Sequence, residues 1–444
     1  MRSERGPHLG PNMSIFGAMT TAIAGLSSQS VAFSNVGDNI ANTQTVGYKS
    51  VDTTFDNYIT VSNSAVNESG SVVARPRYNN SLQGSITQAS SPLDLAISGA
   101  GYLPVSARNG TANGEPTFSS VPLYTRAGDF KLDSTGYLVN SSGNFLNGWP
   151  ADPVTGVINQ TKLTPLQVGQ SGYAPIPTSQ ASISANLPAS PSALAPQYTT
   201  ELPINDAQGT PQNLELTWSQ ATPGSNSWQL SIAQQNNPTV PIATASLDFG
   251  TNGETPGTIS QVNSPYAASA PVKGTNATIT FNAQYANQPA QPITLNLGKY
   301  GGTDGVTQFA GTDYNLVGSS QNGVKPGSFS SVSMQQNGDV QVNYDNGSSR
   351  VLARIPIVTF SSPDSLQRQD GQAFTSTNES GNARINEPGG NGAGKLVISS
   401  LEGSNVDIAS EFTKLIVAQR AYSANTKMVT TADDLLQQTI DMKR

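Results

Sequence analysis

Residues 404–444 carry the most regular pattern in the chain, SNVDIASEFTKLIVAQRAYSANTKMVTTADDLLQQTIDMKR. An apolar residue returns at every seventh position, which is the repeat of a coiled-coil seam. The row consists of Ile408, Leu415, Tyr422, Val429 and Leu436. The pattern predicts a C-terminal helix that is roughly 60 Å long at 1.5 Å per residue. Because a helix cannot bury its apolar row against itself, this helix needs a partner.

The second seam position of this helix carries mostly small or polar groups. Its members are Glu411, Ala418, Asn425, Ala432 and Thr439. Ser404 followed by Asp407 resembles a capping box at the start of the helix, and Lys443 and Arg444 lie at its far end. Acidic residues at the start and basic residues at the end both favour the helix dipole.

A weaker version of the pattern runs from Ser14 to about Asn42. Its heptad row is Met19, Leu26, Phe33 and Ile40. The partner position begins with Phe16 and Ile23 and continues with Ser30 and Gly37, so small residues replace large ones in the second half. These roughly four heptads predict an N-terminal helix.

Two arrangements are open for the predicted helices. They pack on each other within one chain, parallel or antiparallel, or they form a coiled-coil layer between chains. The polar half of the C-terminal seam favours the second arrangement slightly, because a weak internal coil leaves apolar surface for neighbours. The packing partner of the N-terminal row stays open.

The chain between the helices has the period of two that is typical of β-strands. Alternating apolar residues occur at Leu93, Leu95 and Ile97, at Leu214, Leu216 and Trp218, at Trp228, Leu230 and Ile232, and at Val340, Val342 and Tyr344. Turn sequences separate these runs, and Asn346-Gly347 is a strong hairpin signal. We therefore expect a mainly β protein with α-helical termini, in which nested β-domains lie between coiled-coil-forming helices.

Shifts in composition predict the domain boundaries. Proline clusters near residue 150 and between residues 174 and 197 indicate linkers, and a glycine-rich stretch precedes the C-terminal helix. The expected division is a disordered leader or tag remnant (1–12), an N-terminal polymerisation helix (13–42), an extended linker arm (43–85), a discontinuous inner β-domain (86–150 plus 325–400), an inserted outer β-domain or domains (151–324), and a C-terminal polymerisation helix (401–444).

Composition excludes several functional classes. Charged residues make up only 11% of the 444 residues, against about 25% in ordinary soluble domains. The net charge is −7 and no block of Lys and Arg occurs, so the footprint of a nucleic-acid-binding protein is absent. The chain has no cysteine, and it has no apolar stretch of about 18 residues that would indicate a transmembrane helix.

The sequence offers no convincing catalytic, cofactor or metal site. The one histidine, His8, lies in the leader, so no serine nucleophile has a histidine base. Residues 389–395 read like the start of a phosphate-binding loop, but Leu396 stands where that loop needs a hydroxyl. Carboxylate pairs such as Asp129 with Asp133, or Glu201 with Asp206, lie beside turn residues. We expect a protein that is not an enzyme and that needs no cofactor or metal.

Residues 35–49, NVGDNIANTQTVGYK, resemble the N-terminal signature of flagellar rod and hook proteins, and residues 404–427 resemble the closing motif of the same family. Two further stretches, residues 92–102 and 124–130, are similar to the β-core of that family. The residues that carry the terminal motifs are Asn39, Ala41, Asn42, Gly47, Tyr48, Lys49, Asn405, Gln419, Arg420 and Asn425. The long middle segment favours the hook proteins over the shorter rod proteins.

The resemblance implies a structural subunit of the bacterial flagellar hook, which assembles with itself into a curved, flexible tube that acts as a universal joint and transmits motor torque to the filament. The implied partners are further copies, the rod, the hook cap and hook–filament junction proteins, and the type III export apparatus, with no nucleic acid and no membrane insertion. The implied location is the hook, outside the cell after export. Three alternatives remain: a distal rod or related axial protein, a secreted β-rich adhesin, and an enzyme acting on polysaccharides.

Overall fold

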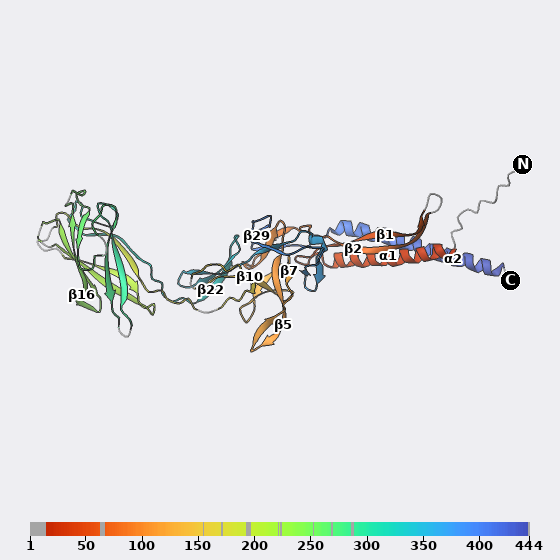
Figure 1. Cartoon of the computed structure of the whole chain (residues 1–444), viewed down its shortest axis with the longest axis horizontal. Helices are drawn as coiled ribbons and strands as arrows, with labels where there is room; N and C mark the ends of the chain where they lie inside the picture. Colours follow the sequence, from red (N-terminus) through yellow and green to blue (C-terminus); the bar gives the residue numbers. More distant parts are fainter. Residues whose placement is uncertain are drawn as a thin grey trace. The chain divides into compact units, whose positions relative to one another are not determined.

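The computed structural model describes residues 15–62, 67–153, 155–169, 172–191, 197–220, 222, 224–251, 253–267, 270–285 and 288–442 (Figure 1). The predicted leader, residues 1–12, lies outside these ranges. The chain divides into two compact units. Unit 1 consists of residues 1–169, 332–342 and 350–444, and unit 2 consists of residues 170–331 and 343–349. Unit 2 is thus inserted into unit 1, and both units are rich in strands. This confirms the predicted class, a mainly β protein with a helix near each end.

Unit 1 contains both helices. Its elements are α1 (Ile15–Ala41), β1 (Val51–Ser62), β2 (Asn67–Tyr78), β3 (Ile86–Gln88), β4 (Leu95–Ser98), β5 (Leu103–Ala112), β6 (Glu115–Phe118), β7 (Leu123–Thr125), β8 (Phe130–Leu132), β9 (Leu138–Asn140), β10 (Asn144–Pro150), β11 (Thr164–Pro165), β25 (Ile357–Thr359), the short helix η1 (Pro363–Ser365), β26 (Gln367–Gln369), β27 (Ala373–Thr375), β28 (Arg384–Asn386), β29 (Lys395–Ile398), β30 (Ser400–Glu402) and α2 (Ile408–Asp441).

The strand pairing of unit 1 joins distant parts of the chain. One sheet follows the order β22-β23-β24-β10-β5-β7-β27-β26, where β22 (Phe329–Met334), β23 (Asp339–Tyr344) and β24 (Ser349–Arg354) extend across the unit boundary. The last strands pair with early ones: β29 pairs with β4, and β30 pairs with β3. The segment that leads into α2 is therefore held beside the segment that follows β2.

Strands β1 and β2 form a long antiparallel hairpin beside α1. From the sequence this region was expected to be an extended linker arm, with no strands assigned. The pattern is hidden because Gly70 and Pro76 interrupt β2, and both residue types weaken a strand pattern. The hairpin nevertheless aligns β1 with β2 along most of their length, with bulges near Ile59.

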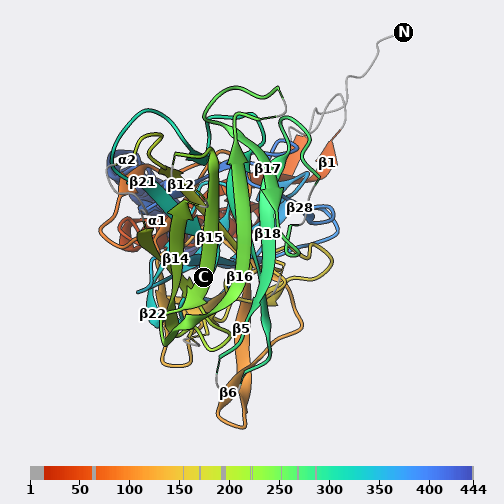
Figure 2. The ribbon, with the colours of Figure 1, turned by 90° about the vertical axis from the view of Figure 1, so that its left-hand side faces the viewer.

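Unit 2 is built from two sheets. Their strands are β12 (Gln180–Asn186), β13 (Gln197–Asn205), β14 (Pro211–Gln220), β15 (Ser227–Gln234), β16 (Asn237–Phe249), β17 (Ile259–Asn263), β18 (Asn276–Ala283), β19 (Gln291–Lys299), β20 (Val306–Thr307) and β21 (Asn315–Gln321). One sheet has the order β13-β14-β15-β16-β17, and the other has the order β18-β19-β12-β20 with β21 against β12. Figure 2 shows β14, β15 and β16 side by side.

The two sheets of unit 2 share one core. Buried and partly exposed residues alternate through the middle of β14 and along most of β15, so the alternation seen in the sequence places one face of each strand inside. Trp218 and Trp228 are completely buried in a cluster that also contains Ile183 and Leu295 from the second sheet. This is the packing of a β-sandwich, in which side chains of two inner faces interdigitate.

Leu216→Ala tests the core of unit 2. Leu216 is fully buried, and the truncation leaves a cavity, so we expect a loss of about 2–5 kcal/mol in the free energy of unfolding of this unit. The matched control is Glu215→Ala on the outer face of the same strand, which should cost less than about 1 kcal/mol. Urea titration followed by tryptophan fluorescence measures both. Equal losses for the two variants would contradict the assigned strand register.

Candidate functional site: the terminal helix pair and its anchor

The two terminal helices lie antiparallel within unit 1. The end of α1 meets the start of α2, where the Asn39 amide nitrogen donates to the Glu411 carboxylate at 3.1 Å. Further along, Phe33 and Tyr422 make an edge-to-face ring contact with centroids 6.4 Å apart. Asp407 caps α2 by accepting a hydrogen bond from the Ser410 amide at 2.9 Å. The cap is thus Asp407 itself, three residues later than the capping box that the sequence suggested.

Small and polar residues form the contact between the helices. Gly25 lies directly against Asn425: a Cβ atom added to Gly25 would lie 2.8 Å from the side-chain nitrogen of Asn425, so a larger residue there would displace that side chain. The buried members of the contact and its borders are Ala22, Gly25, Ser28, Ala32, Val36 and Asn39 of α1 and Glu411, Ala418 and Ala432 of α2. The second seam position of α2 therefore faces α1.

The large residues of the predicted heptad rows lie at the edge of this contact. Phe16 is 62% exposed, Ile23 and Ile408 are each 49% exposed, and Tyr422 is 43% exposed. The other members are half-buried: Met19, Leu26, Phe33, Ile40, Leu415, Val429 and Leu436. Within one chain, the heptad positions with small residues on α1 and α2 contact each other. The heptad positions with large apolar residues stay partly exposed to solvent.

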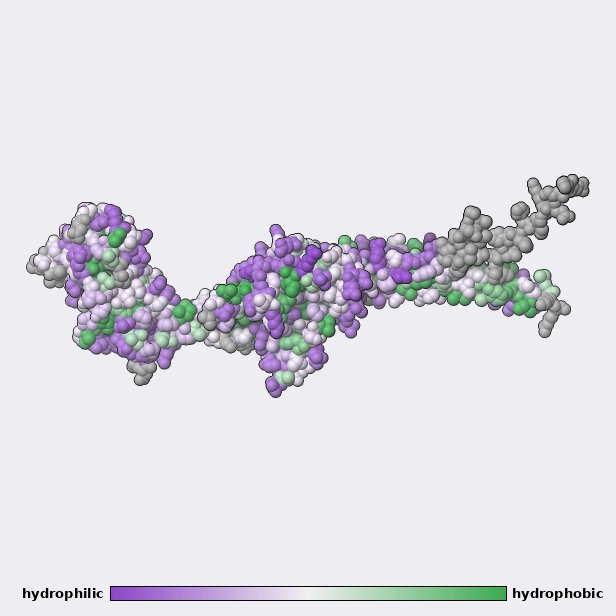
Figure 3. Space-filling view, viewed as in Figure 1, coloured by the Kyte–Doolittle hydropathy of each residue, from purple (hydrophilic) through white to green (hydrophobic). Residues whose placement is uncertain are grey.

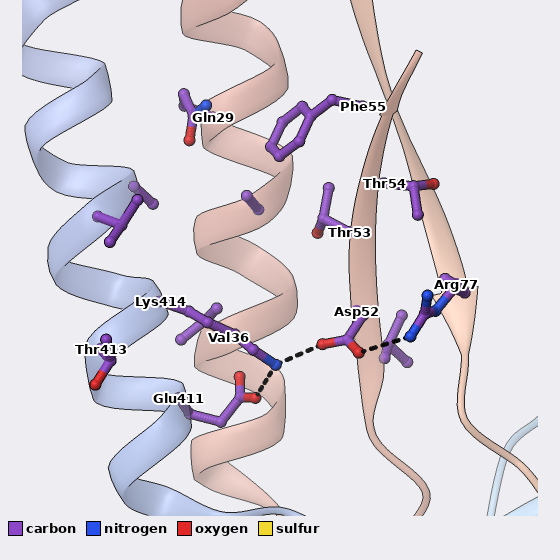
Figure 4. Close-up of a pocket in the computed structure, with 14 residues that line it drawn as sticks. Gln29, Val36, Asp52, Thr53, Thr54, Phe55, Arg77, Glu411, Thr413 and Lys414 are labelled. Carbon is purple, nitrogen blue, oxygen red and sulfur yellow. Dashed lines mark hydrogen bonds and ion pairs between the residues drawn. The ribbon is translucent and has the colours of Figure 1, made fainter.

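The hairpin β1–β2 covers one side of the helix pair. The Ser28 hydroxyl donates to the Val72 carbonyl at 2.9 Å, and the Asn35 amide donates to the Thr53 hydroxyl at 2.8 Å. Between the hairpin and the helices is a groove of about 460 Å³ (Figure 4). Its walls include Val36, Val51, Phe55, Val417 and Ala418.

An ion pair bridges this groove. The Lys414 ammonium lies 2.5 Å from the Asp52 carboxylate of β1 and 2.7 Å from the Glu411 carboxylate of its own helix (Figure 4). Burial alone would raise the pKa of Asp52, but hydrogen bonds from Lys414 and Asn79 outweigh burial and hold that pKa below its usual value. The bridge fixes the hairpin to the start of α2.

The hairpin does not cover the opposite side of the helix pair, and this side has an apolar surface. At 100° per residue, Leu26 and Phe33 point roughly 160° away from Ser28 and Asn35, which touch the hairpin. On α2, Phe412 points roughly 140° away from Val417 of the groove. We call this surface the apolar face; it comprises Phe16, Met19, Ile23, Leu26, Phe33, Ile40, Ile408, Phe412, Leu415, Ile416 and Tyr422. Hydrophobic side chains are visible along this part of the molecule in Figure 3.

A buried carboxylate anchors the helix pair to the strands of unit 1. Both Glu402 and Lys49 are fully buried, and their charged atoms lie 2.5 Å apart. The second Glu402 oxygen accepts from Arg126, which is 3% exposed, at 2.8 Å. Burial lowers the pKa of Lys49, while the attraction of Glu402 opposes that shift. Three segments, the turn after α1, the loop after β7 and the end of β30, therefore meet at one carboxylate.

Backbone groups complete this anchor. The Lys49 ammonium also donates to the Leu82 carbonyl at 2.7 Å, and the Gly84 amide donates to Glu402 at 3.0 Å. The Gly47 amide donates to the Glu402 carbonyl at 2.8 Å. Gly47 has φ of +70°, and a Cβ there would lie 2.5 Å from the backbone nitrogen of Ala127, so only glycine fits.

Two asparagines of the predicted motif hold the turn between α1 and the hairpin. Asn39 is fully buried, and its side chain exchanges hydrogen bonds with both backbone groups of Val51 while accepting one from the Tyr48 hydroxyl. Asn405 accepts from the Ser50 amide at 2.7 Å and donates to the carbonyls of Asn79 and Leu82. Such bonds satisfy backbone groups that a turn leaves unpaired.

The remaining motif residues differ in their surroundings. Asn42 ends α1 by donating to the Asp38 carbonyl at 2.8 Å and accepting from Thr45 at 3.0 Å. Tyr48 is buried beneath Arg368, whose guanidinium lies 4.8 Å from the ring centroid. Three others point outward: Ala41, Gln419 and Arg420 are exposed. The last, Asn425, is half-buried against Gly25.

Glu402 and Arg368 were not identified from the sequence, and Arg126 entered only as part of the family-like stretch 124–130. Glu402 is separated from Lys49 by several hundred residues, so no local spacing connects them. The available signal was rarity, because charged residues are only 11% of this chain and Glu402 directly precedes the motif at 404–427.

Two of the candidate catalytic carboxylates, Asp133 and Asp206, stabilise turns, and Asp129 accepts from the Ser141 amide at 3.3 Å. Asp133 accepts from the amides of Thr135 and Tyr137, and Asp206 accepts from those of Gln208 and Thr210. Glu201 accepts from the side chains of Asn213 and Gln235.

Among the residues that the structure describes, no group of three or more His, Cys, Asp or Glu side chains is arranged to hold a metal. None of the described helices is long and apolar enough to cross a membrane.

Family models match three segments of the chain. Residues 399–442 match the C-terminal region of flagellar basal body rod FlgEFG proteins. Residues 96–176 match the D1 domain of flagellar hook protein FlgE/F/G, and residues 178–324 match the flagellar basal body protein FlaE D2 domain. The matches cover parts of both units and the C-terminal helix.

Full-length relatives agree with these matches. Flagellar hook protein FlgE of Brucella abortus is 34% identical over 97% of this chain and 100% of its own length. The protein of the same name from Rhizobium meliloti is 32% identical with the same coverage, and that from Salmonella typhimurium is 27% identical over 96% of this chain. A crystal structure of Helicobacter pylori flagellar hook protein FlgE2 aligns with 71% of this chain and 100% of its own, with a TM-score of 0.47 and 15% identity.

Glu402→Gln tests the anchor. The change leaves two buried cations without their shared anion, so we expect a loss of about 3–5 kcal/mol in the free energy of unfolding of unit 1. The control is Glu387→Gln, which removes the half-exposed partner of Arg354 and should cost no more than about 1 kcal/mol. Urea titration followed by far-ultraviolet circular dichroism measures both. A loss for Glu402→Gln as small as the control would refute an anchoring role.

Proposed function

The chain belongs to the flagellar hook protein family, and from this premise we propose how it works: it polymerises through its terminal helices into a curved, flexible tube that transmits motor torque to the filament. As a hook protein it is a structural subunit of the flagellar hook. The family membership supports this role over the β-rich adhesin and the polysaccharide-acting enzyme that the sequence left open.

The apolar face is the observation that carries this proposal. The small-residue contact joins α1 to α2 within one chain and leaves the large residues of both heptad rows on the side away from the hairpin. Large contiguous apolar patches on a soluble chain mark interaction surfaces. Burying the patch against neighbours gains roughly 25 cal/mol for each Å² of apolar area removed from water.

The low charge density supports a surface that packs against many copies. Along α1 the only charged residue is Asp38, so nearly the whole helix can be covered by a neighbour without removing ions from water. We propose that residues 13–42 and 401–444 act as the polymerisation helices, that residues 43–85 act as an arm beside them, and that the inner and outer β-domains form the outer layers of the tube.

The finer features of the assignment follow from the same family. We propose a non-enzymatic protein without a cofactor, which assembles with itself and contacts rod, hook cap and hook–filament junction proteins. We propose that the type III apparatus exports it and that its final location is outside the cell in the hook. A location in the rod is the closest competing possibility.

Leu415→Asp tests the apolar face. In the free chain Leu415 is half-buried at the edge of the helix contact, so the β-domains should stay folded. In the polymer the new carboxylate would have to leave water, which costs several kcal/mol for each subunit. We expect at least a hundredfold rise in the concentration needed for assembly, measured by sedimentation and electron microscopy.

The matched control is Ala424→Asp, which puts the same charge on the exposed side of α2, one heptad beyond Val417 of the groove. We expect it to assemble nearly as the unchanged chain does. Tubes of normal yield from Leu415→Asp, with the β-domains intact by circular dichroism, would show that the apolar face is not the assembly surface.

Labelling from outside the cell tests the location. The chain lacks cysteine, so Asn226→Cys in an exposed turn of unit 2 introduces one reactive thiol. A fluorescent maleimide that cannot cross the outer membrane should label short segments at the bases of flagella on living cells. Labelling only after the outer membrane is opened would place the protein in the rod, and diffuse label over the surface would favour an adhesin.

A further inference from the structure

One heptad row on α2 contains two basic residues followed by two acidic residues, here called the basic block and the acidic block. The row reads Arg420, Lys427, Asp434 and Asp441, so two basic residues are followed by two acidic ones at seven-residue intervals. All four are exposed, and none forms an ion pair with any residue that the structure describes. This charged row follows Ile416 at the border of the apolar face, and no described residue of the same chain forms an ion pair with it.

The charged row points directly away from α1. Each of its members follows a residue of the second seam position by two places; Arg420 follows Ala418, and Asp434 follows Ala432. Both alanines are buried against α1. Two residues turn a helix by about 200°, so the charged row lies on the far side of α2, where another molecule can reach it.

The acidic block does not serve the stability of its own helix. Asp441 is the last residue of α2, where the helix dipole disfavours negative charge. Among the described residues, the neighbouring elements offer no compensation: Asp38 is the only charge of α1, and the hairpin residues Asp52, Asp56, Arg75 and Arg77 already form ion pairs. Lys443 and Arg444, which follow Asp441 in the sequence, lie outside the described residues. The basic block and the acidic block have opposite charge, so a second copy of this chain supplies the opposite charges that each block lacks.

We propose that α2 helices of neighbouring copies lie parallel and are staggered by two heptads, with Arg420 and Lys427 of one copy facing Asp434 and Asp441 of the next. This inference rests on the proposed polymerisation. Fourteen residues at 1.5 Å each give an axial offset of about 21 Å between neighbours. The same offset brings the exposed Met428 of one copy level with Met442 of the next.

Other registers are less favourable. With no stagger, all four positions of the row oppose a like charge. A stagger of one heptad brings Lys427 against Asp434 but also Arg420 against Lys427 and Asp434 against Asp441. Two heptads give two attractions and no repulsion. An antiparallel pair would also match the charges, but such a pair is isologous and closes at two copies, whereas the staggered parallel contact leaves a free block at each end and continues without limit.

Disulfide trapping tests the register in polymers of the full chain. The double variant Lys427→Cys/Asp441→Cys keeps the Arg420–Asp434 contact to hold the alignment. Its two cysteines are about 21 Å apart within one helix, too far to bridge internally. After mild oxidation we expect a ladder of covalent multimers on a non-reducing gel. An equal mixture of the two single variants should give dimers only, and each single variant alone should give none.

The control is Lys427→Cys/Asp434→Cys, with thiols about 10.5 Å apart along the helix. We expect no multimers from it. Ladders from this control would indicate a stagger of one heptad, and dimers from it would indicate antiparallel pairs; either result overturns the proposal. So does a lack of multimers from the first variant when electron microscopy shows normal tubes. A failure of the unchanged chain to form any tubes would instead refute the proposed function.

Charge reversal gives a second measurement. Lys427→Asp and Asp441→Lys should each raise the concentration needed for assembly several-fold at low salt, because each places like charges across the contact. The double variant Lys427→Asp/Asp441→Lys should recover assembly, and the differences should shrink at 1 M salt, where the screening length is about 3 Å. Equal defects in the single and double variants would contradict the pairing.

Discussion

The geometry of unit 1 depends on one buried carboxylate. Glu402 sits at the end of β30, where Lys49 and Arg126 converge on it from the start and the middle of the chain. Two buried cations with one anion leave an excess positive charge, and the carbonyls of Leu82, Ile97 and Gly99 accept further hydrogen bonds from these cations, while the Arg126 Nε is buried without a partner. The attraction between the ions offsets the desolvation cost of such a cluster only at short distances, so the cluster defines a specific arrangement of these three segments.

The anchor and the turn beside it determine the direction in which the helices leave the strands. Asn39 and Asn405 bind backbone groups of residues 50, 51, 79 and 82, so the start of α2, the end of α1 and the base of the hairpin share one hydrogen-bond network. Buried networks of this kind become rigid because every member would lose its partners on a small shift. In the proposed tube, a subunit that transmits torque from its helices to its β-domains would need such a junction.

Much of this was accessible from the sequence. Both helices followed from heptad spacing, and alternation revealed the sandwich strands around Trp218 and Trp228. It was harder to predict from the sequence which heptad row of each helix faces the other helix. Coiled-coil rules assign the large row to the partner helix, whereas here Gly25, Ala32 and Ala418 form the close contact within the chain. The role of Glu402 could not be derived, because its partners lie far away in the sequence and meet it only through the pairing of β3 with β30.

The division between small and large rows has a consequence for assembly. A helix that used its large residues to bind its own partner would have little apolar surface left for neighbours, and the chain would be stable but monomeric. Small residues allow a close contact between α1 and α2 at a low cost in apolar area, with extra stability from the hairpin through Ser28, Asn35 and Lys414. The large rows then remain on the surface. The same heptads thereby meet two demands, because one seam position holds the subunit together while the other stays available for the next copy in the proposed assembly.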